Sequence, residues 1–261
     1  MFDTYFEAFL ADNPIGKEIH YRIRYQVYCL ETGWEDAKAF PDGLERDSYD
    51  DHSVHFIVRA RATGDWIAAM RLVVAPLDQL PLTRLVSLDK NVLKNLMSTE
   101  PGGKPGLSAE ISRLCVVSQY RRRAYERNTP YQVPWNPDED SSPLLPTSPN
   151  ERRKAPWLKL GLIRAARDYS EENGIQYWFF LIADPLARIL DSLGMGLQLI
   201  GPPVEHRGIR RPYLRDLKWG YRDIPAKSRE LFEMLSHSTH FRLFSELKRG
   251  EYKLPARTLA A

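Results

Sequence analysis

The sequence predicts an α+β domain, an α/β/α sandwich built on a mixed, twisted sheet. Two strongly apolar segments, residues 107–117 and 175–183, flank a helical segment at residues 156–173. A strand, a helix and a second buried strand in this order form a right-handed βαβ crossover in nearly all known cases, so we expect the two strands to be parallel. Residues 54–60 and 66–75 are two further strands, which a short glycine-containing turn joins as a hairpin.

The composition is typical of a globular protein with a full core. Of the 261 residues, 43% are hydrophobic and 27% are charged, as in ordinary soluble domains. The 37 basic and 34 acidic residues nearly balance, which argues against a dedicated nucleic-acid binder. Cys29 and Cys115 lie in apolar surroundings, so we interpret them as core thiols of a cytoplasmic protein. No apolar run approaches membrane-spanning length, and the first residues lack a basic leader.

We expect one domain over residues 1–261 with two additions. Six prolines between residues 124 and 155 indicate a flexible insertion. Residues 226–261 form a C-terminal extension, whose apolar periodicity predicts two helices before residue 251. The other expected elements are helices at residues 2–10, 15–30, 88–98 and 185–193 and strands at residues 197–200 and 211–218.

A long acidic loop, residues 34–52, follows the second helix. Long ordered loops in compact domains are often functional lids. Carboxylates suit a hard cation, but this loop lacks the regular spacing of a calcium loop, so we do not expect a metal site. The histidine pairs His52 with His55, and His237 with His240, also lack further ligands nearby, and we interpret them as structural.

Three charged residues interrupt apolar strands, namely Arg71, Glu110 and Arg113. Buried charge is costly unless it is paired, hydrogen-bonded or used in chemistry, so these residues are candidates for a functional site. For two charges taken alone, a structural ion pair is the simpler interpretation. Glu110 and Arg113 lie three residues apart, which in a regular strand places them on opposite faces. Either a β-bulge turns one of them, or they serve different sites.

Several motifs occur in a fixed order along the chain. They are RIRYQVYCLETGW (22–34), ERDSYDD (45–51), AAMRLV (68–73), AEISRLCV (109–116) and VEHRGIRRPYL (204–214). Each motif alone is weak, but the ordered series resembles GNAT-type acyltransferases. It resembles more closely the acyl-homoserine-lactone synthases (autoinducer synthases), the N-acyl amino acid synthases and the PEP-CTERM/exosortase system-associated acyltransferases. The resemblance implies a GNAT-like fold and transfer of a medium or long acyl chain from a thioester to an amine, with an amino acid as one candidate.

The same resemblance implies the site residues. Tyr28 and Trp34 would lie beside the thioester arm of the acyl donor. An arginine and carboxylate cluster would lie between the N-terminal segment and the sheet, where arginines suit bidentate binding of an amino acid's carboxylate. This cluster comprises Arg24, Asp47, Asp50, Arg71, Glu110 and Arg113. The lone arginines of the apolar elements would find their carboxylate partners in the acidic loop, which also contains Glu45.

Acyl transfer to an amine needs a base for the amine proton and donors for the developing oxyanion. We expect Glu110 to be the base. Backbone N–H groups near Leu114, Cys115 and Val116, where the two parallel strands splay apart, are the expected oxyanion donors. Cys115 as a nucleophile is the alternative, but no histidine partner is evident, and core packing is the better interpretation. No bound cofactor is expected, because the acyl thioester is a co-substrate.

The expected donor is an acyl-carrier protein. The segment SQYRRRAYERN (118–128) lacks the glycines with which GNAT acetyltransferases hold the coenzyme A pyrophosphate at a helix start. Its arginines and a second basic group across the insertion suit docking of an acidic carrier protein instead; they are Arg121, Arg122, Arg123, Arg152, Arg153 and Lys154.

Alternatives for these regions stay open. The basic residues are otherwise a solvated face or a site for RNA or membrane phosphate. The alternative functions are an acyl-coenzyme A N-acyltransferase and a non-catalytic sensor of acyl-carrier protein. Lactone formation is not expected, because the insertion and the C-terminal helices depart from a compact lactone synthase.

Overall fold

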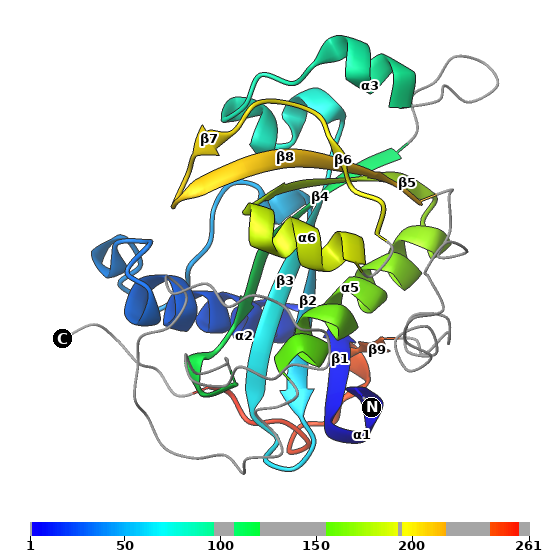
Figure 1. Ribbon diagram of the computed structural model, residues 1–261. Helices are drawn as coiled ribbons and strands as arrows, with labels where there is room; N and C mark the ends of the chain where they lie inside the picture. Colours follow the sequence, from blue (N-terminus) through cyan, green and yellow to red (C-terminus); the bar gives the residue numbers. More distant parts are fainter. Residues whose placement is uncertain (1, 97–106, 121–154, 193–194, 218–240, 256–261) are drawn as a thin grey trace.

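The computed structural model describes residues 2–96, 107–120, 155–192, 195–217 and 241–255 (Figure 1). Their strands form one mixed sheet in the order β6-β8-β5-β4-β3-β2-β1-β9, with β7 paired to β8 outside this path. The predicted α+β class is therefore confirmed. The strands are β1 (Phe6–Leu10), β2 (Ser53–Ala60), β3 (Trp66–Val74), β4 (Leu107–Val116), β5 (Ile175–Ile182), β6 (Gln198–Leu199), β7 (Val204–Glu205), β8 (Ile209–Asp216) and β9 (Arg242–Leu243).

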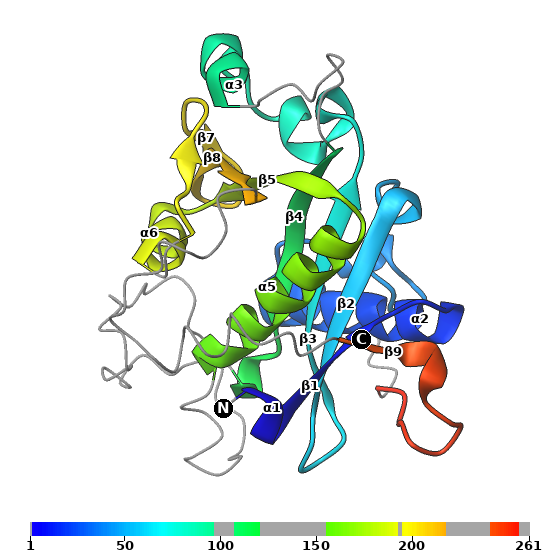
Figure 2. The same ribbon diagram turned by 90° about the vertical axis from the view of Figure 1, so that its right-hand side faces the viewer.

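Two long helices cover opposite faces of the sheet (Figures 1 and 2). His55 of β2 pairs with Arg71 of β3, and its ring lies 4.6 Å from that of His20 in α2. The next residue, Phe56, contacts the ring of Tyr169 in α5 at 6.1 Å. Because consecutive strand residues face opposite sides, α2 and α5 must lie on different faces. The helices are α1 (Phe2–Tyr5), α2 (Pro14–Arg24), α3 (Lys90–Leu96), α5 (Ala155–Glu172) and α6 (Asp184–Ser192).

The second predicted helix is confirmed, and its last turns widen. The Asn13 side chain accepts a hydrogen bond from the Gly16 backbone N–H at 2.8 Å and caps α2. After Arg24 the chain continues as a π-helix, Tyr25–Glu31. Such wide turns insert an extra residue and often occur at functional sites. Gly33 follows with φ 64°, a left-handed conformation that glycine adopts without steric cost.

The predicted parallel crossover is also confirmed. β4 pairs with β5 in parallel from Leu107 with Ile175 to Ile111 with Phe180. Beyond this pair β4 continues to Val116 without further pairing to β5. The two central strands therefore separate halfway along β4.

A β-bulge interrupts β4 directly after this point. Arg71 of β3 lies opposite Ser112, whereas Ala69 lies opposite Cys115, so two residues of β4 face one residue of β3. The first of them, Arg113, has φ 54°. The bulge offered as one explanation for the spacing of Glu110 and Arg113 is confirmed.

The core consists of two apolar clusters. The larger one includes the apolar side chains on the α5 side of the sheet, among them Met70, Leu72 and Trp178. The second one, on the other side of the sheet, includes Val73, Leu82 and Phe179. No described helix is long and apolar enough to cross a bilayer.

Two predicted helices were wrong in part. Residues 6–10 form β1, which pairs antiparallel with β2 and is almost wholly buried, because a short apolar run satisfies strand and helix patterns equally. Residues 241–247 contain β9 and a 3₁₀ turn, Phe244–Glu246, in place of a helix. Residues 226–240 and the insertion at 124–154 lie outside the described residues.

The packing of the N-terminus on α5 gives a stability test. A Cβ atom on Gly161 would lie 2.1 Å from the ring of buried Phe2, so Gly161→Ala should cost about 1–3 kcal/mol of unfolding free energy. In a Phe2→Ala background the same change should become neutral or stabilising by up to ~1 kcal/mol, because alanine is the better helix former. Urea unfolding of the double-mutant cycle measures both values. Equal costs in the two backgrounds would contradict the contact.

Candidate active site

A buried charged cluster joins α2, the acidic loop and two central strands. Arg24 of α2 forms an ion pair with Glu45 and places Nη1 2.6 Å from Asp50 Oδ1. Arg71 of β3 places Nη1 2.5 Å from Asp47 Oδ1 and 2.9 Å from Asp50 Oδ1. The acidic loop thus supplies the partners that the lone arginines require, as the sequence indicated.

Arg113 joins the same cluster from β4. Its Nε lies 3.2 Å from Glu45 Oε1 and its Nη2 lies 3.1 Å from Asp47 Oδ2. Because Arg71 and Arg113 contact the same carboxylate, both guanidinium groups lie on the α2 side of the sheet. Glu110 pairs with Val73, two residues along β3 from Arg71, and therefore shares this face. The bulge thus brings Glu110 and Arg113 to one side.

Asp50 is the central carboxylate of the cluster. Besides the two arginines, its Oδ1 meets His55 Nε2 at 3.0 Å, and its Oδ2 accepts the Asp47 backbone N–H at 2.7 Å. Burial alone would raise its pKa, but these donors and charges hold the pKa far below its ordinary value. His55 is buried and held by this contact, in agreement with a structural role.

Glu110 has a contrasting environment. It is 4% exposed, and its Oε2 accepts the Leu82 backbone N–H at 2.7 Å. Desolvation raises the pKa of its carboxyl to about 7, and the Leu82 hydrogen bond and the positive charges of Arg71 and Arg113 only partly oppose this rise. It forms no ion pair with the cluster among the described residues. A carboxyl with a pKa near neutrality suits reversible proton transfer.

Tyr28 and Trp34 form an aromatic wall beside the cluster. Their rings stack at 5.9 Å, and the Tyr28 hydroxyl donates to the Leu114 carbonyl at 3.4 Å. Tyr28 is buried, which raises the pKa of its hydroxyl, whereas Trp34 is 40% exposed. The wall therefore links the end of the π-helix to the bulged part of β4.

Two members of the charged site escaped the sequence analysis. Arg207, in the turn between β7 and β8, forms an ion pair with Glu35, which follows Trp34 in the acidic loop. The Arg113 Nη2 lies 3.5 Å from the same Glu35 carboxylate. The motif 204–214 was noticed as part of the resemblance, but no local pattern indicated where its arginines would point.

Other predicted residues are placed as follows. Cys29 and Cys115 are buried, and burial raises the pKa of each thiol to about 12, which opposes a nucleophilic role. The backbone of Leu114–Val116 lies beyond the last β4–β5 pair. The six basic residues proposed for carrier docking, Arg121, Arg122, Arg123, Arg152, Arg153 and Lys154, lie outside the described residues.

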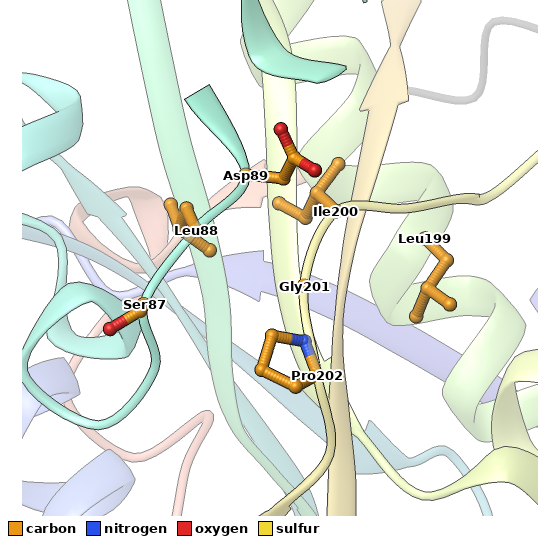
Figure 3. Close-up of a pocket in the computed structure, with 7 residues that line it drawn as sticks. All are labelled: Ser87, Leu88, Asp89, Leu199, Ile200, Gly201 and Pro202. Carbon is orange, nitrogen blue, oxygen red and sulfur yellow. The ribbon is translucent and has the colours of Figure 1, made fainter. Parts of the chain in front are cut away.

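A pocket of about 370 Å³ lies apart from this cluster, between residues 87–89 and residues 199–202 (Figure 3). None of the predicted site residues lines it. Ile200, in its wall, belongs to the second apolar cluster together with Leu82, whose N–H holds Glu110.

Comparison with known proteins identifies the fold. Residues 23–129 match the family model described as an acetyltransferase (GNAT) domain. BjaI, a CoA-dependent acyl-homoserine lactone synthase, aligns in complex with SAM and isopentyl-CoA over 92% of both chains, at 17% identity and a TM-score of 0.53. Its complex with MTA gives 19% identity and the same TM-score of 0.53 over 92% of both chains. This chain has the GNAT fold.

The predicted resemblance to GNAT-type acyltransferases and to acyl-homoserine-lactone synthases is therefore confirmed, and the match to an acetyltransferase domain supports the prediction of an acyltransferase. FeeM, an N-acyl amino acid synthase from uncultured soil microbes, also aligns, over 84% of this chain and 94% of its own at 13% identity and a TM-score of 0.49. The GNAT match begins within α2 and includes the acidic loop, Arg71 and the bulged strand. It thus spans most of the charged site.

The central carboxylate gives a second stability test. Asp50→Asn leaves the buried guanidinium groups of Arg24 and Arg71 without their shared counter-charge, and we expect a loss of about 3–5 kcal/mol in unfolding free energy. The exposed neighbour Asp51 is the matched control, because the same change there should stay within about 0.5 kcal/mol. Urea unfolding of both variants at neutral pH provides the measurement. Similar effects of the two substitutions would contradict a central role of Asp50.

Proposed function

We propose that the protein is an N-acyltransferase that moves a medium or long acyl chain from a thioester to an amine. The observation that carries this proposal is Glu110, a buried carboxyl with a pKa near 7 on the central strand. It lies next to the last β4–β5 pair, where the two strands begin to separate. An extended substrate would lie where β4 no longer pairs with β5 and would meet backbone donors of β4 there.

The proposed reaction needs no covalent enzyme intermediate. The neutral amine nitrogen forms a bond to the thioester carbonyl carbon, and the carbon–sulfur bond breaks. The proton that the nitrogen loses passes to Glu110, directly or through water, and then to the leaving thiolate. Leu82 holds one oxygen of Glu110 by its N–H, so the other oxygen is the one we assign to proton transfer.

The developing oxyanion needs hydrogen-bond donors in a fixed position. We assign this task to backbone N–H groups of Leu114–Val116, because this segment continues beyond the pairing with β5. Tyr28 supports its position by donating to the Leu114 carbonyl. The aromatic wall of Tyr28 and Trp34 is the proposed place for the thioester arm.

An amino acid is the proposed acceptor. Arg24 and Arg71 are almost fully buried and bonded to loop carboxylates, so we assign them to positioning the loop. Arg113 lies at the accessible rim of the cluster, with 17% of its side chain exposed. Guanidinium groups at this rim can receive a substrate carboxylate through paired hydrogen bonds.

For the donor, we propose acyl-carrier protein first and acyl-coenzyme A as the alternative. The departure of residues 118–128 from a glycine-rich phosphate loop supports carrier protein. The similarity to BjaI, a CoA-dependent synthase, supports coenzyme A. A sensor that binds carrier protein without turnover is the non-catalytic alternative, and association with the PEP-CTERM/exosortase system stays a prediction.

The first functional test offers acyl-carrier-protein and coenzyme A thioesters of medium and long chains with a panel of amines. We expect thiol release that depends on the amine, together with an N-acyl product in the mass spectrum. Reactions without amine control for thioester hydrolysis. No release from any thioester would contradict the proposed activity and favour the sensor.

The second test concerns Glu110. Only its carboxylate form can accept a proton, so kcat/KM should fall about tenfold for each pH unit below about 7. Glu110→Gln should remove nearly all turnover at every pH. Rates measured from pH 5 to 9 would test both expectations, and unchanged turnover in the variant would exclude Glu110 as the base.

The same variant should remain folded. The raised pKa means that Glu110 keeps its proton in the folded state at a pH where the unfolded chain has already lost it. The folded state therefore loses stability as pH rises from about 4.5 to 7. Because glutamine carries no charge, the variant should be at least as stable as the parent at pH 8, as urea unfolding would show.

A further inference from the structure

The turn between β7 and β8 meets the acidic loop at a single carboxylate. Arg207, in this turn, forms an ion pair with Glu35, although 172 positions separate them. Arg113 approaches the same carboxylate from the bulge of β4, with its Nη2 at 3.5 Å. Three separate parts of the chain therefore converge on Glu35.

Both arginines have unusual backbone conformations. Arg113 has φ 54° and Arg207 has φ 53°, and they are the only non-glycine residues with positive φ in the described part of the chain. This conformation is sterically costly for a residue with a Cβ atom, and such residues cluster at functional sites. Their guanidinium carbons also lie over the same ring, that of Tyr28, at 5.6 and 6.0 Å.

The Glu35–Arg207 pair differs from the inner pairs in its access to solvent. The side chains of Arg207 and Glu35 are 21% and 22% exposed, whereas those of Arg24 and Arg71 are 0% and 1% exposed. Partly exposed ion pairs are held weakly, because water competes for both partners. A ligand with suitable charges can therefore separate this pair, while the inner cluster stays intact.

The free amino acid is a ligand whose charges suit both halves of the pair. Its ammonium group would meet Glu35 and its carboxylate would meet Arg207, so neither protein charge loses its partner. A simple amine would leave Arg207 without its ion-pair partner, and a simple carboxylate would leave Glu35 with only the longer contact to Arg113. Leaving a partly buried charge unpaired weakens binding, so a ligand that carries both charges is favoured over one that carries a single charge.

We infer that Arg207 is a specificity-determining residue that binds the carboxylate of the acceptor. Glu35 receives the acceptor's ammonium group; one proton of this group passes to solvent to give the neutral amine, and Glu110 accepts the second when the nitrogen attacks the thioester. Arg113 connects this position to the base, because it contacts Glu35 and lies three residues from Glu110 on the same face of the sheet. This inference rests on the proposed function.

The test compares each of the common amino acids with its carboxamide, which keeps the amine and side chain but lacks the negative charge. The parent protein should prefer at least one amino acid over its carboxamide. In Arg207→Gln, kcat/KM for that amino acid should fall about 10- to 100-fold, the range for loss of one charged hydrogen-bonded contact. The value for the carboxamide should change less than about threefold.

Arg46→Gln is the matched control. Arg46 lies in the same acidic loop, is 51% exposed and pairs with Asp42, so this change removes one positive charge without touching Glu35. It should leave the preference for the amino acid unchanged. Arg207→Lys keeps the charge but loses the paired hydrogen bonds, and it should recover part of the preference.

Two readouts separate this inference from the proposed function. Thiol release with any acceptor tests the proposed function alone. Ligand-observed NMR of the same amino acid and carboxamide pairs without thioester tests carboxylate binding alone. Three outcomes would overturn the role of Arg207. In Arg207→Gln, kcat/KM could fall equally for the amino acid and its carboxamide, or the preference for the amino acid could stay unchanged. The third outcome is that no amino acid binds to the parent protein in the NMR experiment.

Discussion

The structure depends on the contacts of one buried carboxylate, that of Asp50. It binds Arg24 of α2, Arg71 of β3, His55 of β2 and the backbone N–H of Asp47 in the acidic loop. Together with the ion pairs of Glu45 and Asp47, these contacts fix the acidic loop on the sheet. The charges of the helix and the strand also need this loop, because each guanidinium is desolvated. The helix, the sheet and the loop are thus stabilised together.

The same face of the sheet holds two kinds of carboxyl group. Asp47 and Asp50 receive hydrogen bonds from arginine, and their pKa values are lowered. Glu110 lies on that face but meets the Leu82 N–H in place of a guanidinium, and burial raises its pKa to about 7. When their environments shift the pKa values of neighbouring carboxyl groups in opposite directions, the groups suit different roles. The carboxyl with the lowered pKa stays ionised and serves the structure, whereas the carboxyl with the raised pKa suits proton transfer. This contrast favours Glu110 over the loop acids as the base.

The sequence was informative where a physical rule is local or compositional. Apolar runs and turn residues predicted the hairpin and the parallel crossover, and the cost of buried charge indicated that Arg71 needs a carboxylate partner. It was uninformative where the outcome depends on distant contacts. Residues 6–10 become a strand because β2 offers a free edge, and Arg207 reaches Glu35 only through the path of the whole sheet. Which carboxylate pairs with each arginine is likewise set by the packing of distant segments, and the spacing of apolar residues in the sequence does not reveal it.

The bulge of β4 follows from the same need to pair buried charge. In a regular strand Arg113 would point to the α5 side, where Met70 and Leu72 belong to the larger apolar cluster, and its charge would have no partner. One extra residue turns it to the α2 side, where Glu45 and Asp47 lie. The bulge begins just after β5 leaves β4, so no second ladder resists the distortion. The strained backbone that pairs Arg113 therefore lies where β4 has lost one of its two ladders, three residues beyond Glu110 in the proposed reaction centre.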